Sequence, residues 1–228
     1  MLRTFTIVDP EVRTLSVVDD GALVEEGSPL ATATGSARSL LAAERVALNL
    51  LGQLSGVATA TRELADKIAD TGASLVDTRK TVPGLRALQK SAVLAGGGEN
   101  HRMGLYDAVL IKDNHIAVSG SAKAAVKQAR SKVGPDVTIE IEIESVDELE
   151  TVISAGADVV MLDNMNTEDM AVAVSLADGR CKLEASGGIT MATIREVAET
   201  GVDMISVGWL THSAPALDVA LELDYIES

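Results

Sequence analysis

After Gly72 the sequence alternates short apolar runs with amphipathic segments, and this alternation constrains the fold more than any other feature. It is typical of a parallel sheet whose strands are covered by helices. Helix starts fall between the runs, because Ser145 with Glu148 fits a capping box, and Thr167 and Thr190 each precede a helical segment. Six runs fit strands, at 73–76, 108–111, 137–143, 158–162, 182–185 and 203–207.

Polar residues follow each of these six runs. In a parallel α/β barrel the carboxyl ends of the strands form one mouth, and active sites lie there. The sequence therefore predicts a single site built from six strand ends. The polar segments are Asp77-Thr-Arg-Lys80, Lys112-Asp-Asn-His115, Glu144-Ser145, Asp163-Asn164, Ser186-Gly-Gly188, and Gly208 with Thr211-His-Ser213.

The first 72 residues follow a different pattern. Three β-like runs, Phe5 to Val8, Thr14 to Val18 and Pro29 to Thr34, are separated by turn-forming clusters and predict a small antiparallel sheet. Apolar spacings near 3.6 residues then predict two helices between residues 36 and 72. We expect a first domain at 1–72, a barrel domain with the active site at 73–213, and a C-terminal helix and tail at 214–228.

The chain has 228 residues, enough for one large core, and carries 34 acidic against 19 basic residues, a formal charge of −15. This balance argues against binding to nucleic acid or a membrane surface, because such proteins need basic stripes. The single Cys181 excludes an intrachain disulfide and a cysteine-built zinc site. No apolar run reaches the ~18 residues of a spanning helix, and no signal-peptide pattern is present, so we expect a cytoplasmic protein.

Strict alternation in segment 138–144 places Glu140, Glu142 and Glu144 on one face of a strand and isoleucines on the other. Two interpretations are open. An edge strand would present the acidic face to water, whereas an interior strand would turn it into the barrel lumen, where cations must compensate it. Asp163, at the end of the next strand, favours the lumen and a divalent ion such as Mg²⁺, held partly through water and substrate oxygens.

Basic residues are concentrated between positions 79 and 112. Arg86 and Lys90, four residues apart on a predicted helix, fit a solvated face as well as a site. The others stand at strand ends or beside Gly96-Gly-Gly98, where the planar fork of an arginine suits a carboxylate and a lysine suits a phosphate. The cluster consists of Arg79, Lys80, Arg86, Lys90, Arg102 and Lys112, with His101 beside them.

Glycines end two late strands, in Ser186-Gly187-Gly188 and at Gly208, and helix starts follow them. Such turns resemble the phosphate cradle of α/β barrels, where backbone N–H groups receive an anion. His212 fits either a phosphate donor or a loop cap, and His115 fits a hydrogen-bonded structural histidine equally well.

A set of ordered motifs carries a resemblance to a known family. They are Glu44-Arg-Val-Ala-Leu-Asn49 with Leu54-Ser-Gly-Val-Ala-Thr59, Asp77-Thr-Arg-Lys-Thr81 with Pro83-Gly-Leu-Arg86, Gly96-Gly-Gly-Glu-Asn-His-Arg102, Leu110-Ile-Lys-Asp-Asn-His115, Glu140-Ile-Glu-Ile-Glu-Ser145, Met161-Leu-Asp-Asn164, Glu184-Ala-Ser-Gly-Gly188, and Val207-Gly208 with Leu210-Thr-His-Ser213. Over residues 15–223 the sequence resembles the quinolinate phosphoribosyltransferases, also called carboxylating nicotinate-nucleotide diphosphorylases.

The resemblance implies an α/β fold, an incomplete TIM-like α/β barrel with a small N-terminal α/β sandwich domain. The sandwich is expected to be truncated, because the family's N-terminal helices and first sandwich strand have no counterpart in this sequence. The resemblance also implies a homodimer in which each site borrows residues from the partner subunit, or a hexamer of such chains.

The implied reaction joins quinolinate to phosphoribosyl pyrophosphate with Mg²⁺ and yields nicotinate mononucleotide, pyrophosphate and CO₂, in NAD biosynthesis. By the same resemblance, quinolinate is bound by Arg79, His101, Arg102 and Lys112, with Arg45 reaching it from the neighbouring subunit. Phosphoribosyl pyrophosphate is bound by Lys80, Glu142, Asp163, Ser186, Gly187, Gly188, Gly208 and His212. Lys80, Lys112, Glu142 and Asp163 are the expected catalytic residues, with the metal at Glu142 and Asp163 through water.

Two other functions are kept as alternatives. An aldolase-like barrel would use Lys112 as a Schiff-base amine, but the sequence shows no apolar pocket around this lysine. A non-catalytic or differently specific paralogue, such as a molybdenum-transport-associated protein of the same fold, is disfavoured by Arg79, Arg102 and Lys112 occurring together.

Overall fold

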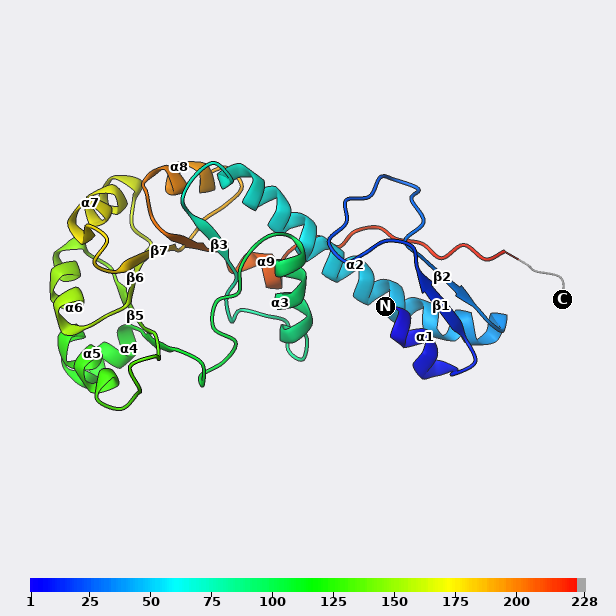
Figure 1. The fold of residues 1–228 in the computed structure, drawn as a ribbon, viewed down its shortest axis with the longest axis horizontal. Helices are drawn as coiled ribbons and strands as arrows, with labels where there is room; N and C mark the ends of the chain where they lie inside the picture. The colour runs from blue at the N-terminus through cyan, green and yellow to red at the C-terminus, as the bar shows by residue number, and fades with distance from the viewer. Residues whose placement is uncertain (225–228) are drawn as a thin grey trace.

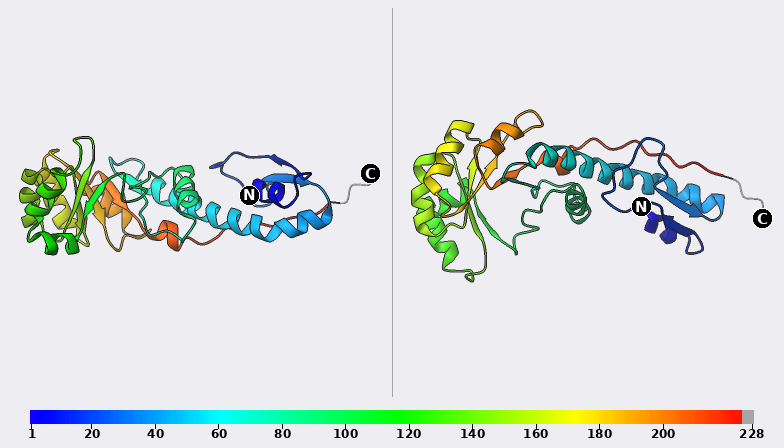
Figure 2. Two further views of the ribbon diagram at one scale, coloured as in Figure 1. Left: turned by 90° about the horizontal axis from the view of Figure 1, so that it is seen from below. Right: turned by 45° about the horizontal axis from the view of Figure 1, so that its top comes forward.

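The protein consists of two lobes joined by one long helix, as a computed structural model that describes residues 1–224 shows (Figure 1). Helix α2 (Ala37–Ile68) begins in the N-terminal lobe and ends against the barrel lobe. The two views in Figure 2 show an elongated molecule with the barrel at one end. The small lobe is thus held away from the barrel by the length of α2.

The barrel lobe contains six strands, in agreement with the six predicted runs. Their spatial order is β3-β8-β7-β6-β5-β4, and every neighbouring pair is parallel. Because β3 and β4 are the two ends of this order, the barrel formed by the described residues is not closed, which confirms the expected incomplete barrel. The strands are β3 (Ser74–Val76), β4 (Val109–Ile111), β5 (Ile139–Ile143), β6 (Val159–Asp163), β7 (Lys182–Ser186) and β8 (Met204–Ser206).

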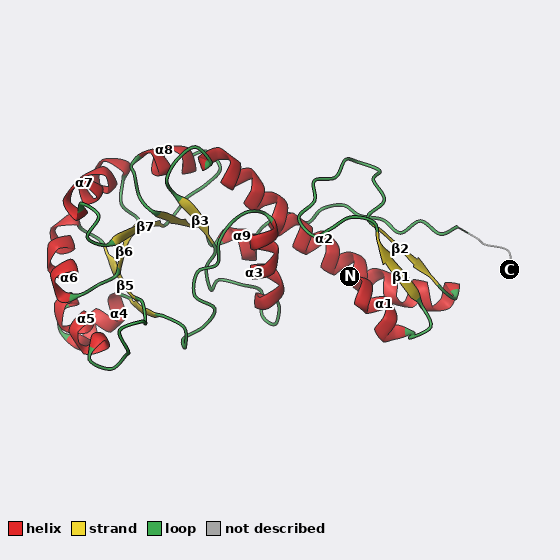
Figure 3. Cartoon of the chain, viewed as in Figure 1, coloured by secondary structure: helices red, strands yellow, loops and turns green. Residues whose placement is uncertain are grey.

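Helices cover the outer face of this sheet (Figure 3). The outer layer contains α5 (Ala122–Arg130), α6 (Leu149–Ala155), α7 (Thr167–Ala177) and α8 (Ile194–Glu199). Shorter elements near the strand ends are α3 (Arg86–Ala95), α4 (Asp113–Ser119), a 3₁₀ turn (Val146–Glu148) and α9 (Trp209–His212). The capping box predicted at Ser145 and Glu148 is replaced by a simpler cap, in which the Ser145 hydroxyl accepts the Asp147 N–H at 3.3 Å.

Strand β5 decides between the two interpretations of the acidic face. It lies inside the sheet, between β4 and β6, so the edge-strand alternative is wrong. Ile139, Ile141 and Ile143 are buried in the main core, which also takes in apolar residues of the covering helices. Because side chains alternate along a strand, Glu140 and Glu142 point to the opposite side, into the barrel.

The N-terminal lobe differs from its prediction in one element. Residues 5–8 are part of helix α1 (Leu2–Val8), not a strand. Its Phe5 is buried in a small core with Leu40 and Ala43 of α2, and this packing outweighs the β-propensity of a Thr-Ile-Val sequence. The other two runs do pair as antiparallel strands, β1 (Arg13–Ser16) with β2 (Ala31–Thr34).

Helix α2 replaces the two helices predicted between residues 36 and 72. The helix continues through Gly52 and Gly56, and both glycines serve a tertiary contact. The Gly52 carbonyl accepts the Leu217 N–H at 2.9 Å, and a Cβ on Gly56 would overlap the Pro215 carbonyl oxygen. The two glycines thus let an extended segment lie directly on the helix.

That extended segment corrects the C-terminal prediction. Residues 214–224 contain no helix, and the remainder of the expected C-terminal helix and tail, 225–228, lies outside the described residues. Pro215 supplies no backbone N–H, and Leu217 hydrogen-bonds to α2 instead of to its own segment. Within residues 1–224, no helix combines the length and apolar character that a membrane span requires.

Replacing Gly56 with alanine tests the packing of this segment on α2. Alanine favours a helix by about 1 kcal/mol over glycine, but the overlap with Pro215 outweighs this gain, so Gly56→Ala is expected to lower the free energy of unfolding by about 2 kcal/mol. The measurement is urea denaturation followed by circular dichroism. Gly72→Ala, which meets no atom within 4 Å, is the control and changes stability little. Equal or greater stability of Gly56→Ala would contradict the contact.

Candidate active site

The carboxyl ends of the strands carry most of the residues that the sequence marked. Arg79 and Lys80 follow β3, His101 and Arg102 lie in the segment between α3 and β4, and Lys112 follows β4. Glu142, Asp163 and Ser186 stand at or near the ends of β5, β6 and β7, and Gly208 follows β8. The tertiary structure therefore brings these strand ends to one edge of the open barrel, as predicted.

A buried ion pair holds the segment that carries two of these residues. Lys90 on α3 and Asp77 after β3 are 1% and 0% exposed, and the Lys90 ammonium donates to the Asp77 carboxylate. Both groups also bind the backbone of His101: Lys90 Nζ donates to its carbonyl oxygen at 2.8 Å, and Asp77 Oδ1 accepts its N–H at 2.9 Å. Of the two interpretations left open for Lys90, the solvated face is therefore wrong.

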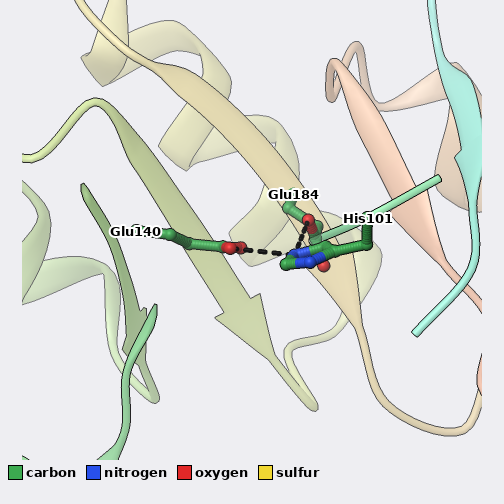
Figure 4. Close-up of side chains that lie close together, drawn as sticks. All are labelled: His101, Glu140 and Glu184. Atoms are coloured by element: carbon green, nitrogen blue, oxygen red, sulfur yellow. Dashed lines mark hydrogen bonds and ion pairs between the residues drawn. The ribbon is translucent and has the colours of Figure 1, made fainter. Parts of the chain in front are cut away.

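Three side chains meet inside the barrel, as Figure 4 shows. His101 Nε2 lies 2.9 Å from Glu140 Oε2 on β5 and 3.4 Å from Glu184 Oε2 on β7. Its other ring nitrogen, Nδ1, lies 2.7 Å from the backbone nitrogen of Arg102, which donates to it. The ring thus links two strands of the sheet to the main chain of Arg102.

The protonation of this cluster follows from its surroundings. Burial alone would lower the pKa of His101, but its hydrogen bond to Glu140 and the negative charges of Glu140 and the nearby Glu184 outweigh burial and raise it to about 10. The Arg102 N–H acts in the opposite direction, because it opposes a proton on Nδ1. Burial, helped by the charge of Glu184, raises the pKa of Glu140 to about 6 against the hydrogen bond from His101.

Arg79 and Arg102 bring two positive charges together, and neither forms an ion pair among the described residues, although the charges of Glu140 and Asp107 act on Arg102. Burial, and then the charge of Arg79, lower the pKa of Arg102 below its ordinary value. Among the described residues, Arg79 Nε is buried without a hydrogen-bond partner, and Arg102 Nη1 donates to the Ala108 carbonyl at 3.2 Å. Two guanidinium groups in this state form a site prepared for an anion.

Glu142 and Asp163 lie on neighbouring strands and on the same side of the sheet. The register pairs Glu142 with Met161, so Asp163 stands two residues further towards the mouth, and it pairs with Ser186. Glu142 is only partly exposed and accepts an ion-pair hydrogen bond from Lys112. Asp163 accepts from the side-chain amide of Asn164 at 2.7 Å.

Lys80, Gly208 and His212 also come together. A Cβ on Gly208 would lie 3.0 Å from Lys80 Cδ and 3.6 Å from His212 Nε2, so a larger residue would crowd both side chains. The Thr211 hydroxyl donates to the Lys80 carbonyl oxygen at 2.7 Å and fixes the loop after β3 against α9.

The glycine turn after β7 lets the backbone pass close to the end of β6. Gly187 and Gly188 have φ of 99° and 62°, in the left-handed region that favours glycine. A Cβ on Gly187 would overlap the side chain of Asn164, so the turn packs against the end of β6. Its backbone therefore lies beside Asp163 and Ser186 at the mouth.

Three of the marked residues have other surroundings. Arg45 is an exposed residue of α2 that pairs with Glu44 at 3.4 Å and lines a separate cavity of about 490 Å³ beside residues 214–219, so it does not join the site within this chain. Arg86 binds the Thr81 hydroxyl and the carbonyls of Arg79 and Met103. His115 Nδ1 accepts the Lys112 N–H at 2.9 Å and is a structural cap of α4.

The sequence assigned no role at the site to Asp77 or Glu184, and it left Lys90 open between a solvated face and the site. Asp77 opens the polar segment after β3, and this position was the available signal for it. The partner of Lys90 is 13 residues away, and that of Glu184 is His101, in the segment before β4, so neither pairing has a local pattern.

Comparison with known proteins agrees with this geometry. The family model of the quinolinate phosphoribosyl transferase N-terminal domain matches residues 2–55, and that of the C-terminal domain matches residues 57–222. The chain belongs to the quinolinate phosphoribosyltransferase family. The two matches meet inside α2, and the boundaries expected at residues 72 and 213 stay predictions.

Relatives of this quinolinate phosphoribosyltransferase family member are similar over most of its length. A probable nicotinate-nucleotide pyrophosphorylase [carboxylating] of Bacillus subtilis is 46% identical over 219 residues, which are 96% of this chain and 76% of the relative. The nicotinate-nucleotide pyrophosphorylase [carboxylating] of Mycobacterium leprae is 45% identical, over 92% of this chain and 75% of its own.

Solved structures of the family have the same fold. The nicotinate-nucleotide pyrophosphorylase from Francisella tularensis superposes with a TM-score of 0.91 at 43% identity, covering 95% of this chain and 77% of that one. A deletion mutant of NadC superposes with a TM-score of 0.94 at 42% identity, covering 99% of this chain and 81% of that one. Both lobes of the quinolinate phosphoribosyltransferase fold are therefore present.

Lys90→Met tests the ion pair that holds His101. Removal of the ammonium leaves the Asp77 carboxylate buried and unpaired, so the free energy of unfolding is expected to fall by about 3 to 5 kcal/mol. The double variant Asp77→Asn/Lys90→Met removes both charges and is expected to recover most of this loss. Urea denaturation measures both, with the exposed Lys123→Met as control. A loss below 1 kcal/mol for Lys90→Met would contradict the assignment.

Proposed function

We propose that the protein transfers the phosphoribosyl group of phosphoribosyl pyrophosphate to the ring nitrogen of quinolinate and releases pyrophosphate and CO₂, giving nicotinate mononucleotide for NAD synthesis. Its relatives are named for this reaction. The observation that carries the proposal is the pair of arginines, Arg79 and Arg102: the charge of Arg79 lowers the pKa of Arg102, Arg79 Nε is buried without a hydrogen-bond partner, and neither guanidinium forms an ion pair among the described residues.

The charge of quinolinate fits this pair. The substrate carries two carboxylates on adjacent ring carbons, and two guanidinium forks can each receive one of them. Lys112 at the end of β4 adds a third cation, already oriented by its ion pair with Glu142. These groups would hold the pyridine with its nitrogen turned towards the sugar donor.

The opposite part of the mouth suits phosphoribosyl pyrophosphate. Lys80 supplies a positive charge beside Gly208 and His212, and the turn Ser186 to Gly188 exposes backbone near them for phosphate oxygens. Glu142 and Asp163 would face the sugar, where positive charge develops at the anomeric carbon as pyrophosphate leaves.

Glu142 and Asp163 also fit a magnesium ion. Mg²⁺ is commonly held by one or two carboxylates together with water and substrate phosphate oxygens, and these two carboxylates lie on one side of adjacent strands near the mouth. When bound, the ion would neutralise charge on the pyrophosphate group. In the described structure Glu142 is paired with Lys112, so its carboxylate is already held at this position.

Decarboxylation needs little from the protein beyond orientation. Once the ring nitrogen is bonded to the sugar it is cationic, and its charge stabilises the electron pair left on the adjacent carbon when CO₂ departs. That carbon then takes up a proton from water in place of the lost CO₂. The guanidinium that receives the retained carboxylate would keep the ring in place during this step.

A homodimer is part of the same proposal. Arg45 lies on α2, away from the mouth of its own chain, and would reach the site of a partner subunit. Exposed apolar residues of the N-terminal lobe, among them Ile7, Leu15 and Leu23, support an interface there. We also place the protein in the cytoplasm, where a reducing environment suits the single free Cys181.

The two alternative functions are less well supported. The Lys112 ammonium pairs with Glu142 and its side chain is 46% exposed, whereas a Schiff-base lysine needs a desolvated pocket. The relatives reported above are named as catalytic pyrophosphorylases, which does not favour a transport-associated paralogue.

Substrate omission tests the reaction. Pyrophosphate and CO₂ are expected to form in equal amounts only when quinolinate, phosphoribosyl pyrophosphate and Mg²⁺ are all present, and removal of Mg²⁺ with a chelator should abolish release. Coupled assay of pyrophosphate and trapping of CO₂ from labelled quinolinate measure this. Comparable turnover with nicotinate, which lacks the second carboxylate, would refute the substrate assignment.

Arg102→Ala tests the carboxylate site. Loss of a charge-assisted, bidentate contact is expected to weaken quinolinate binding by about 2 kcal/mol, roughly 30-fold in Kd. Isothermal titration of the free protein with quinolinate measures it. Arg180→Ala is the matched control, because Arg180 pairs with Glu150 at the amino end of β7, away from the mouth, and should leave the Kd unchanged. Equal affinities of wild type and Arg102→Ala would contradict the site.

A further inference from the structure

Two buried carboxylates inside the barrel lack most of their hydrogen bonds. Glu140 and Glu184 are 4% and 0% exposed. Among the described residues, Glu140 Oε1 and both oxygens of Glu184 are buried without a hydrogen-bond donor. Both carboxylates lie beside the His101 ring: Nε2 is 2.9 Å from Glu140 Oε2 and 3.4 Å from Glu184 Oε2 (Figure 4).

Two buried, negatively charged glutamates are unfavourable for stability, and their charge by itself is unfavourable for binding an anionic substrate. A buried carboxylate without hydrogen bonds costs free energy, and a polar or apolar residue of the same size would remove that cost. Negative charge near a pocket for a dianion also repels the ligand. The role of the two glutamates must therefore lie in what they do to His101.

The ring has little freedom left between its neighbours. Because Nδ1 accepts the Arg102 N–H, the neutral ring carries its hydrogen on Nε2, which donates to Glu140 on β5 and lies 3.4 Å from Glu184 on β7. On the other side Nδ1 meets the Arg102 N–H at 2.7 Å, and Arg102 is the next residue along the chain. The position of the ring and that of the Arg102 backbone are therefore coupled.

We propose that Glu140 and Glu184 are positioning residues that act through His101, fixing its ring and the adjoining Arg102 so that both meet the carboxylates of quinolinate. The inference rests on the proposed function. It assigns the glutamates no contact with the substrate: their carboxylates hold the imidazole, and the imidazole holds the Arg102 backbone. The Asp77 and Lys90 pair fixes the main chain of His101 from the outside, and the glutamates fix its side chain from within.

A metal ion is the competing explanation, because His101, Glu140 and Glu184 offer three ligand atoms within 4.8 Å of one another. A metal bound at Nε2 requires the proton of the neutral ring on Nδ1, where metal-binding histidines normally donate to an acceptor. Here Nδ1 receives an N–H instead. The geometry therefore favours the positioning role.

Glu184→Gln, which keeps the size of the side chain and removes its charge, separates these explanations. The KM for quinolinate is expected to rise tenfold or more, while the KM for phosphoribosyl pyrophosphate stays within twofold and the midpoint of thermal unfolding is not lowered. A lower quinolinate KM would show that charge repulsion dominates, and an unchanged one that the glutamate has no role; either result overturns the proposal. Glu140→Gln is the second variant, and the exposed Glu196→Gln is the control.

The same substitution in a His101→Asn background tests the route of the effect. If the glutamate acts through the ring, Glu184→Gln changes the quinolinate KM less than twofold once the ring is absent; a full tenfold change there overturns the proposal. Stoichiometric metal that is present in the purified wild type and lost in His101→Asn also overturns the proposal. Failure of the wild type to turn over quinolinate contradicts the proposed function itself, whereas wild-type turnover with unaltered kinetics in Glu184→Gln contradicts the positioning role alone.

Discussion

The ion pair between Asp77 and Lys90 is the interaction on which the site depends. It joins the end of β3 to α3, both side chains are buried, and each also binds the backbone of His101. An ion pair in such a place is weak evidence for stability, because both charges lose their hydration. Its effect is geometric: it sets the position of a loop that has no regular structure of its own and that carries His101 and Arg102 to the mouth.

The mouth of the barrel separates its charges. Arg79 and Arg102 lie together and form no ion pair among the described residues, whereas Glu140, Glu142 and Glu184 point into the lumen and are met by His101 and Lys112. A chain with a formal charge of −15 attracts an anionic substrate only if it concentrates cations locally, and the loops after β3 and before β4 do so. The same separation leaves an acidic patch for the sugar and its metal.

Local pattern was sufficient for most of the fold. Apolar runs bounded by turn residues located all six barrel strands, and the polar residues after them located the mouth. Local pattern failed where packing opposed it. Residues 5–8 are helical because Phe5 packs on α2, and Gly52 and Gly56 lie within one helix because residues 214–217 rest on them. Neither contact has a signal within the window of residues that periodicity uses.

The sequence by itself determined the alternation of strands and helices, the acidic face of β5 and the family, because periodicity, turn residues and motif order are properties of neighbouring residues. Only the tertiary structure decided that Lys90 is buried, that Glu184 joins His101, and that Arg45 lies apart from the mouth of its own chain. The physical reason is that burial and charge pairing depend on which distant segments meet, and the free energy of a charged side chain is set by those partners and not by its neighbours in the chain.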